Sequence, residues 1–139
     1  MKKKNGFTLV ELLAVIVILA IILVIAVPQI MSVIDDATRA SLESSVKMVA
    51  AEVENQYTVA QTLSKEFNKT GKCTAAAAPW AGLNATDYAD CDYVIDDDGN
   101  ATVTVKGKGK FADYPSCQGT RASITACEKN GTPVASPAA

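Results

Sequence analysis

The stretch that decides the fold is GFTLVEL (residues 6–12), which leads into an unbroken apolar run from Leu12 to Val27. With residues 7–11 included, the run is about 21 residues long. At 1.5 Å per residue, this matches the roughly 30 Å hydrocarbon core of a bilayer. Three lysines, Lys2 to Lys4, precede it. The segment is therefore predicted to span a membrane as a helix.

Two common kinds of apolar N-terminus, the secretory signal peptide and the plain signal anchor, also follow basic residues. A signal peptide has a shorter apolar region that ends in a small-residue cleavage site, whereas this run continues into an amphipathic pattern. A plain anchor has no reason to carry Glu11, since a carboxylate within the hydrocarbon costs about 2.5–3.5 kcal/mol. No obvious partner lies nearby in the sequence, so a partner from another subunit is the simplest expectation.

The short basic leader, Gly6, Phe7, Glu11 four residues later and the apolar helix resemble the N-terminus of type IV pilins and their pseudopilin relatives. The resemblance implies that a prepilin peptidase cuts between Gly6 and Phe7 on the cytoplasmic side and N-methylates Phe7. It also implies that Glu11 neutralises the Phe7 ammonium of a neighbouring subunit, and that Pro28 is the family's helix proline. A charge pair in apolar surroundings is attractive when matched and costly when one partner is missing, so it would select the correct stagger.

The helix is predicted to continue beyond the apolar run. Pro28 removes one backbone donor, so we expect a local kink or loosening there. Apolar residues then recur at intervals of three and four, which predicts one apolar stripe along a helix. The stripe consists of Ile30, Ile34, Leu42, Val46, Val49, Val53, Tyr57, Ala60, Leu63 and Phe67. With Gly71 as the stop signal, a single helix is predicted from about Phe7 to about Lys69.

All four cysteines lie in the polar part of the chain, and an even number there predicts two disulfides formed in an oxidising compartment. Three connectivities are open, and the short loops favour Cys73–Cys91 with Cys117–Cys127. A zinc site is not expected, because there is no Cys-x-x-Cys pair and no histidine. Oxygen-bearing side chains between residues 96 and 100 lack the spacing of an EF-hand, so no calcium site is expected either.

Short strands are predicted in the last part of the chain. Residues 93–95 and 101–105 flank the turn sequence DDGN (residues 97–100), a strong hairpin signal. A third strand is expected around residues 121–127, followed by a turn and a frayed tail that includes Pro133. Trp80, in the preceding loop, is expected to pack against the helix stripe. The predicted fold class is α+β, the type IV pilin fold, in which the second half of the helix packs on a small antiparallel sheet.

Lys106, Lys108 and Lys110 form the one basic cluster that remains once residues 1–6 are removed, and that removal leaves 10 basic against 15 acidic residues. The simplest interpretation is a loop or edge strand protected by charge against aggregation. The functional alternative is contact with DNA or another polyanion, repeated along a filament.

The predicted organisation is a leader (1–6), a transmembrane and filament-core helix (7–28), its amphipathic continuation (29–70) and a disulfide-stapled domain (71–139). No catalytic motif is recognisable, so neither an enzyme nor a cofactor is expected. The expected partners are further copies in a helical filament, the prepilin peptidase, the cytoplasmic membrane before assembly and the pilus assembly machinery. Adhesion or surface motility would follow at the cell surface; the alternative is a pseudopilin of a type II secretion or DNA-uptake apparatus.

Overall fold

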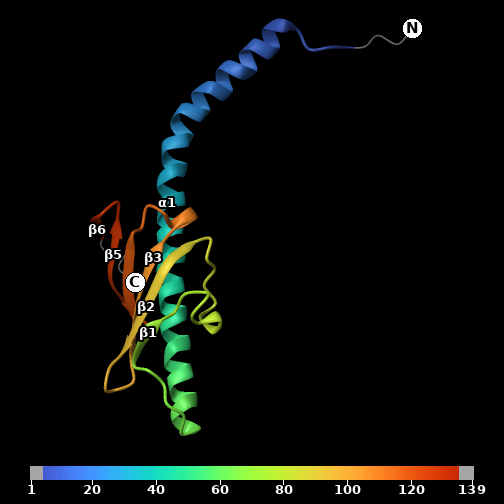
Figure 1. The fold of residues 1–139 in the computed structure, drawn as a ribbon. Coiled ribbons are helices and arrows are strands. Elements are labelled where there is room, and N and C mark those ends of the chain that lie inside the picture. The colour runs from blue at the N-terminus through green and yellow to red at the C-terminus, as the bar shows by residue number, and fades with distance from the viewer. Residues whose placement is uncertain (1–4, 135–139) are drawn as a thin grey trace. The chain divides into compact units, whose positions relative to one another are not determined.

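The computed structural model describes residues 5–134, and the chain divides into two compact units at Ala37 and Thr38. Its first element, the helix α1 (Leu9–Thr62), belongs to both units. Figure 1 labels α1 and, among the strands that follow it, β1, β2, β3, β5 and β6. The remaining elements are β1 (Thr70–Lys72), η1 (Pro79–Ala81), β2 (Tyr88–Ile95), β3 (Ala101–Gly107), η2 (Gly109–Phe111), β4 (Ser116–Thr120), β5 (Ile124–Lys129) and β6 (Thr132–Val134).

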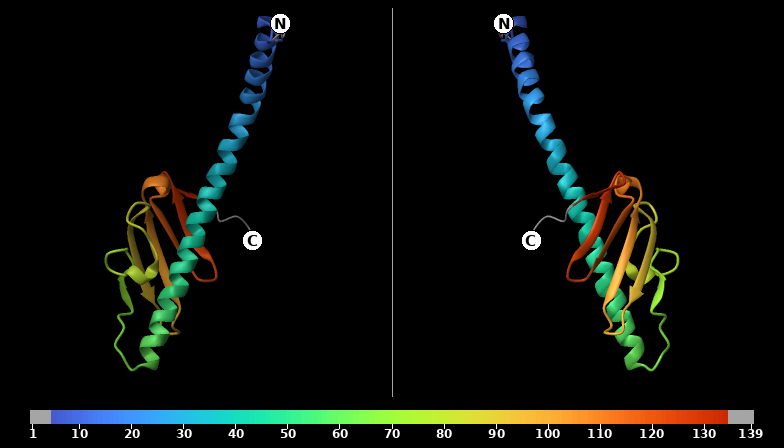
Figure 2. Two further views of the ribbon diagram at one scale, coloured as in Figure 1. Left: turned by 90° about the vertical axis from the view of Figure 1, so that its right-hand side faces the viewer. Right: turned by 90° about the vertical axis from the view of Figure 1, so that its left-hand side faces the viewer.

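The six strands form one antiparallel sheet in which each strand pairs with its neighbour in sequence. Figure 2 shows from two sides that this sheet lies against the later turns of α1. The α+β prediction of a long N-terminal helix packed on a small antiparallel sheet is confirmed. The sheet is a simple meander, because every connection joins adjacent antiparallel strands.

The core of the second unit lies between α1 and the inner face of the sheet. Leu42, Val46 and Val49 of α1 are fully buried, and so are Val103 and Val105 of β3. The two β3 residues are two positions apart, as one face of a strand requires. The intervening Thr104 lies on the outer face and is half-buried. The apolar face of the helix and the apolar face of the strand therefore pack together in one core.

The first unit has no core in the part that the structure describes. Among its residues 5–37, none is buried, and the apolar side chains from Leu9 to Ile34 are largely exposed. α1 is long and apolar enough to cross a membrane. Pro28 lies inside α1, and the helix continues on both sides of it.

The helix ends earlier than predicted, at Thr62 rather than near Lys69, so the predicted limit of 70 for its continuation was wrong. Ser64 adopts a left-handed conformation with φ of 53°, which commonly ends helices. Phe67 then contacts the rings of Tyr57 and Trp80 at centroid distances of 6.2 and 6.5 Å. Phe67, the last residue of the predicted stripe, therefore lies after the helix and belongs to an aromatic cluster.

Gly71 does not stop the helix but lies in β1, opposite Tyr93 of β2. A Cβ atom at this position would lie 2.7 Å from the Tyr93 hydroxyl oxygen. The glycine is therefore explained by the close approach of the tyrosine ring to the strand, a long-range contact that helix signals cannot reveal.

The predicted hairpin is confirmed as β2 and β3, and both strands are longer than predicted. The third predicted strand corresponds to β5, displaced by two or three residues. Pro133, predicted to lie in a frayed tail, belongs to β6 at the edge of the sheet. An edge strand tolerates proline because it has an unpaired side. β1, β4 and β6 were not predicted.

Both disulfides have the connectivity that the short loops favoured, Cys73–Cys91 and Cys117–Cys127. Cys117 and Cys127 lie directly opposite each other on β4 and β5. Cys73 follows β1, and its amide donates to the carbonyl of Cys91 at 2.8 Å. All four cysteines are buried in the core of the second unit.

Candidate processing and assembly site

The first turn of α1 is closed by a reciprocal pair of hydrogen bonds between Thr8 and Glu11. The Glu11 amide donates to Thr8 Oγ1 at 3.2 Å, and the Thr8 amide donates to Glu11 Oε2 at 3.0 Å. The Thr8 carbonyl accepts the first helical bond, from the Leu12 amide at 3.2 Å. Thr8 is therefore the N-cap and Glu11 the N3 residue of a capping box.

This capping box corrects one sequence-based expectation, that Glu11 has no partner nearby in its own chain. The pattern Thr-x-x-Glu at residues 8–11 is the signal that would have revealed it. A carboxylate can accept about four hydrogen bonds, and the contact with Thr8 uses one. Glu11 therefore retains the capacity to bind a further donor or cation.

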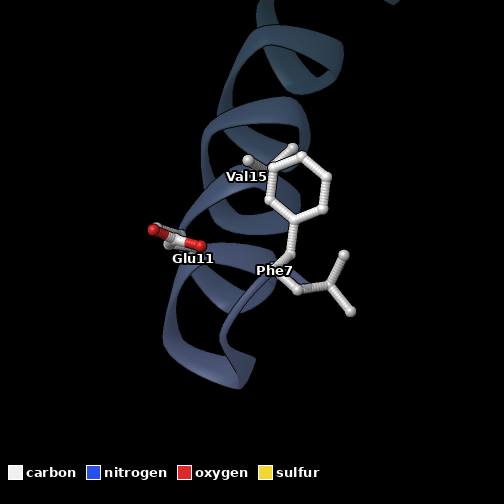
Figure 3. Close-up of a pocket in the computed structure, with 5 residues that line it drawn as sticks. Phe7, Glu11 and Val15 are labelled. Atoms are coloured by element: carbon white, nitrogen blue, oxygen red, sulfur yellow. The ribbon is translucent and has the colours of Figure 1, made fainter. Parts of the chain in front are cut away.

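Gly6 and Phe7 lie just before the helix and are accessible. A Cβ atom placed on Gly6 would meet no other atom within 4 Å, and the Phe7 side chain is 92% exposed. Figure 3 shows the Phe7 ring beside Val15, with the Glu11 carboxylate on another side of the first turns. Phe7, Glu11 and Val15 are among the residues that line an open apolar hollow of about 490 Å³. Lys2 to Lys4 of the leader lie outside the described residues.

A comparison with known families agrees with this N-terminal arrangement. Residues 1–27 match the family described as the prokaryotic N-terminal methylation motif. The chain carries the type IV prepilin signature. The prepilin motif supports a place in the type IV pilin or pseudopilin class and implies processing by a prepilin peptidase and assembly into pilus-like filaments. No curated protein and no solved structure matches the chain.

The prepilin motif and the apolar helix also fit a membrane-anchored precursor that later joins a surface filament. The motif covers 27 residues, so it says nothing of the second unit. The α+β arrangement of a long helix and an antiparallel sheet is the fold expected of a pilin.

The basic cluster of the second unit is largely paired with aspartates. Lys106 Nζ lies 3.9 Å from Asp90 Oδ2, and Lys110 Nζ lies 3.2 Å from Asp87 Oδ2. The cluster was expected on a loop or an edge strand. The edge strand is wrong for Lys106, because β3 pairs with β2 on one side and β4 on the other, whereas Lys110 lies after this strand in η2. Lys108 follows β3 and precedes η2. The cluster therefore presents less free positive charge than the sequence suggests.

The aspartates of this region are stabilised in their charged form. The hydrogen bond from Lys72 is the main cause that lowers the pKa of Asp90, and the Cys91 amide adds to it. The hydrogen bond from Asn84 is the main cause that lowers the pKa of Asp87, with Lys110 contributing less. Both carboxylates therefore stay ionised at neutral pH and offset the lysines.

One polar contact between the helix and the sheet was missed from the sequence, that of Glu54 of α1. Its Oε1 accepts a hydrogen bond from the Ala101 amide at 3.1 Å, and its Oε2 lies 3.8 Å from Arg121 Nη1. Glu54 therefore connects α1 to the start of β3 and to the turn between β4 and β5. Glu54 also lines an open hollow of about 610 Å³, together with Asp96 and Asn100.

Proposed function

We propose that the chain is the structural subunit of an extracellular type IV pilus that serves adhesion or surface motility. Prepilin peptidase would hydrolyse the Gly6–Phe7 bond, adding one water to form a carboxylate on Gly6 and an ammonium on Phe7. A sulfonium methyl donor would then methylate the Phe7 amine, with loss of a proton. The observation that carries the proposal is the match of residues 1–27 to the N-terminal methylation motif.

The exposed apolar surface of the first unit supports assembly through α1. Leu9, Leu12, Ile16 and Leu19 each keep more than half of their accessible surface. Burying such side chains contributes about 1.5–3 kcal/mol each. Lipid provides this environment before assembly, and the helices of neighbouring subunits provide it in the filament.

Glu11 would then pair with the Phe7 ammonium of a neighbouring subunit. Its position in the first turn keeps the carboxylate close to the membrane-facing apolar surface, where an unmatched charge is costly. The capping box uses one hydrogen-bond acceptor position of this carboxylate and leaves others for the ammonium. Pro28 would shape the same helix where subunits pack.

The proposal is tested by Glu11→Gln, which keeps the size of the side chain and one acceptor oxygen and removes its charge. Loss of one partner of a buried charge pair costs about 3–5 kcal/mol, so we expect the yield of sheared surface filament to fall by about a hundredfold or more. Glu66→Gln, which removes an exposed carboxylate of the second unit, is the matched control and should leave the yield unchanged.

Normal filament yield from Glu11→Gln would contradict the pairing. The amount of the wild-type protein in sheared surface filaments distinguishes a pilus subunit from a pseudopilin. A pilus subunit is the main mass of sheared fibres, whereas a pseudopilin is a minor component of the cell envelope.

A further inference from the structure

The capping box fixes where α1 begins, two residues after the Gly6–Phe7 bond. The Thr8 amide is bonded to Glu11 Oε2, so it is not available to a backbone carbonyl one turn upstream. Residues 5–8 accordingly lie outside the helix. The box therefore acts as a stop against growth of the helix toward the N-terminus.

The position of this stop matters for hydrolysis. If the helix began one turn earlier, the Gly6 carbonyl would accept a hydrogen bond from the Val10 amide, as helical geometry requires. That carbonyl carbon is the atom that water must attack, and a peptidase must reach it and polarise its oxygen. In the observed structure Gly6 precedes the helix and has open space around it.

We infer that Thr8 is a positioning residue for the processing reaction, because its capping box with Glu11 holds the Gly6–Phe7 bond outside the helix where the peptidase can bind it. This inference rests on the proposed function, since it assumes cleavage between Gly6 and Phe7. It assigns Thr8 no contact with the reacting atoms. The hydrolysis itself consumes one water and yields the Gly6 carboxylate and the Phe7 ammonium.

Glu11 has two proposed roles, capping of the helix and pairing with an ammonium, and they need different properties of its side chain. Capping requires an oxygen acceptor at N3, which glutamine also supplies. Pairing with an ammonium requires the negative charge, which glutamine lacks. Glu11→Gln should therefore be cleaved at close to the wild-type rate even though its assembly fails.

The test is the rate of cleavage of the full-length chain in membranes that contain its prepilin peptidase, followed by intact-mass spectrometry. Thr8→Val keeps the branched shape of threonine and removes the capping oxygen, while Thr8→Ser and Thr8→Asn restore a capping oxygen on side chains of different shape. We expect cleavage of Thr8→Val to be slower by up to about fivefold, because loss of an average N-cap changes the equilibrium constant between the two helix starts by about that factor. Cleavage of Thr8→Ser, Thr8→Asn and Glu11→Gln should stay within about twofold of wild type.

The matched control is Ser32→Ala, which removes a hydroxyl bonded to the Gln29 carbonyl within the same helix, far from the cleaved bond. Its rate should equal that of the wild type. An unchanged rate for Thr8→Val would overturn the inference. The inference would also be overturned if Thr8→Ser and Thr8→Asn were cleaved as slowly as Thr8→Val, because the peptidase would then be recognising the shape of threonine. A wild-type chain that is not cut before Phe7 would instead overturn the proposed function.

Discussion

The two units of this chain are stabilised in different ways. None of residues 5–37 is buried, and residues 9–37 of this segment are helical, whereas the described part of the second unit has a continuous apolar core and two disulfides. The second unit thus contains its own source of stability. The first depends on apolar surroundings that the single chain does not provide. The core of the second unit and the exposed apolar surface of the first therefore lie on separate parts of one continuous helix.

The largest difference in stability between the two units is expected when both disulfides are removed. Replacing all four cysteines by serine should destabilise the second unit by about 3 kcal/mol per bond, because each bond closes a short loop in the unfolded chain. The sequence separations are 18 and 10 residues. Urea unfolding of the full-length chain in micelles, followed by the fluorescence of the single tryptophan, measures the loss.

Helix content of the first unit should persist in the same variant, because none of its residues lies in a disulfide loop. Circular dichroism in micelles checks this. Loss of that helix together with the second unit would contradict the separate stabilisation of the two units, since it would mean that they fold as one.

A smaller effect is expected from a matched pair of leucine substitutions in α1. Leu42 has no exposed surface, so Leu42→Ala creates a cavity in the core and should lower the free energy of unfolding by about 2–5 kcal/mol. Leu19→Ala removes a side chain that is 51% exposed, so it should change that free energy by less than about 0.5 kcal/mol. The measurement is again urea unfolding in micelles, and equal losses would contradict the separate origin of stability.

The smallest effect concerns the charges on the outer face of the sheet. Lys72 lies 2.8 Å from Asp90 Oδ2 and lowers the pKa of this carboxyl. Because the folded-state pKa is depressed, the stabilisation is fully present above the unfolded pKa of about 3.9. It is lost as the pH falls through the lower folded-state value.

Asp90→Asn should therefore cost less than about 1 kcal/mol between pH 5 and 7, because the pair is partly solvent-screened. The difference from wild type should shrink below about pH 4. Unfolding free energies at a series of pH values measure it, with the exposed Asp98→Asn as the control. A difference that grows in acid would show that the assigned direction of the pKa shift is wrong.

The sequence predicted the first unit better than the second for a physical reason. Helical periodicity and the residues 6–12 are local signals, and the helix and the prepilin motif followed from them. The same local reasoning found the hairpin of β2 and β3 through its turn. It overlooked the capping box of Thr8 and Glu11, although the Thr-x-x-Glu pattern was present.

The errors lie where distant contacts decide the structure. β1 and β6 contain three residues each, too few for a recognisable alternation, and they exist because a neighbouring strand pairs with them. Gly71 resembles a helix stop but accommodates the Tyr93 ring. The lysine cluster resembles a free basic patch until its aspartate partners on and beside β2 are seen.

The most direct test of the central claim is intact-mass and N-terminal mass spectrometry of the protein recovered from cells. We expect a chain that begins at Phe7 and carries one added methyl group on its amine. An intact Met1, or a cut near Ala26 at the end of the apolar run, would contradict this expectation.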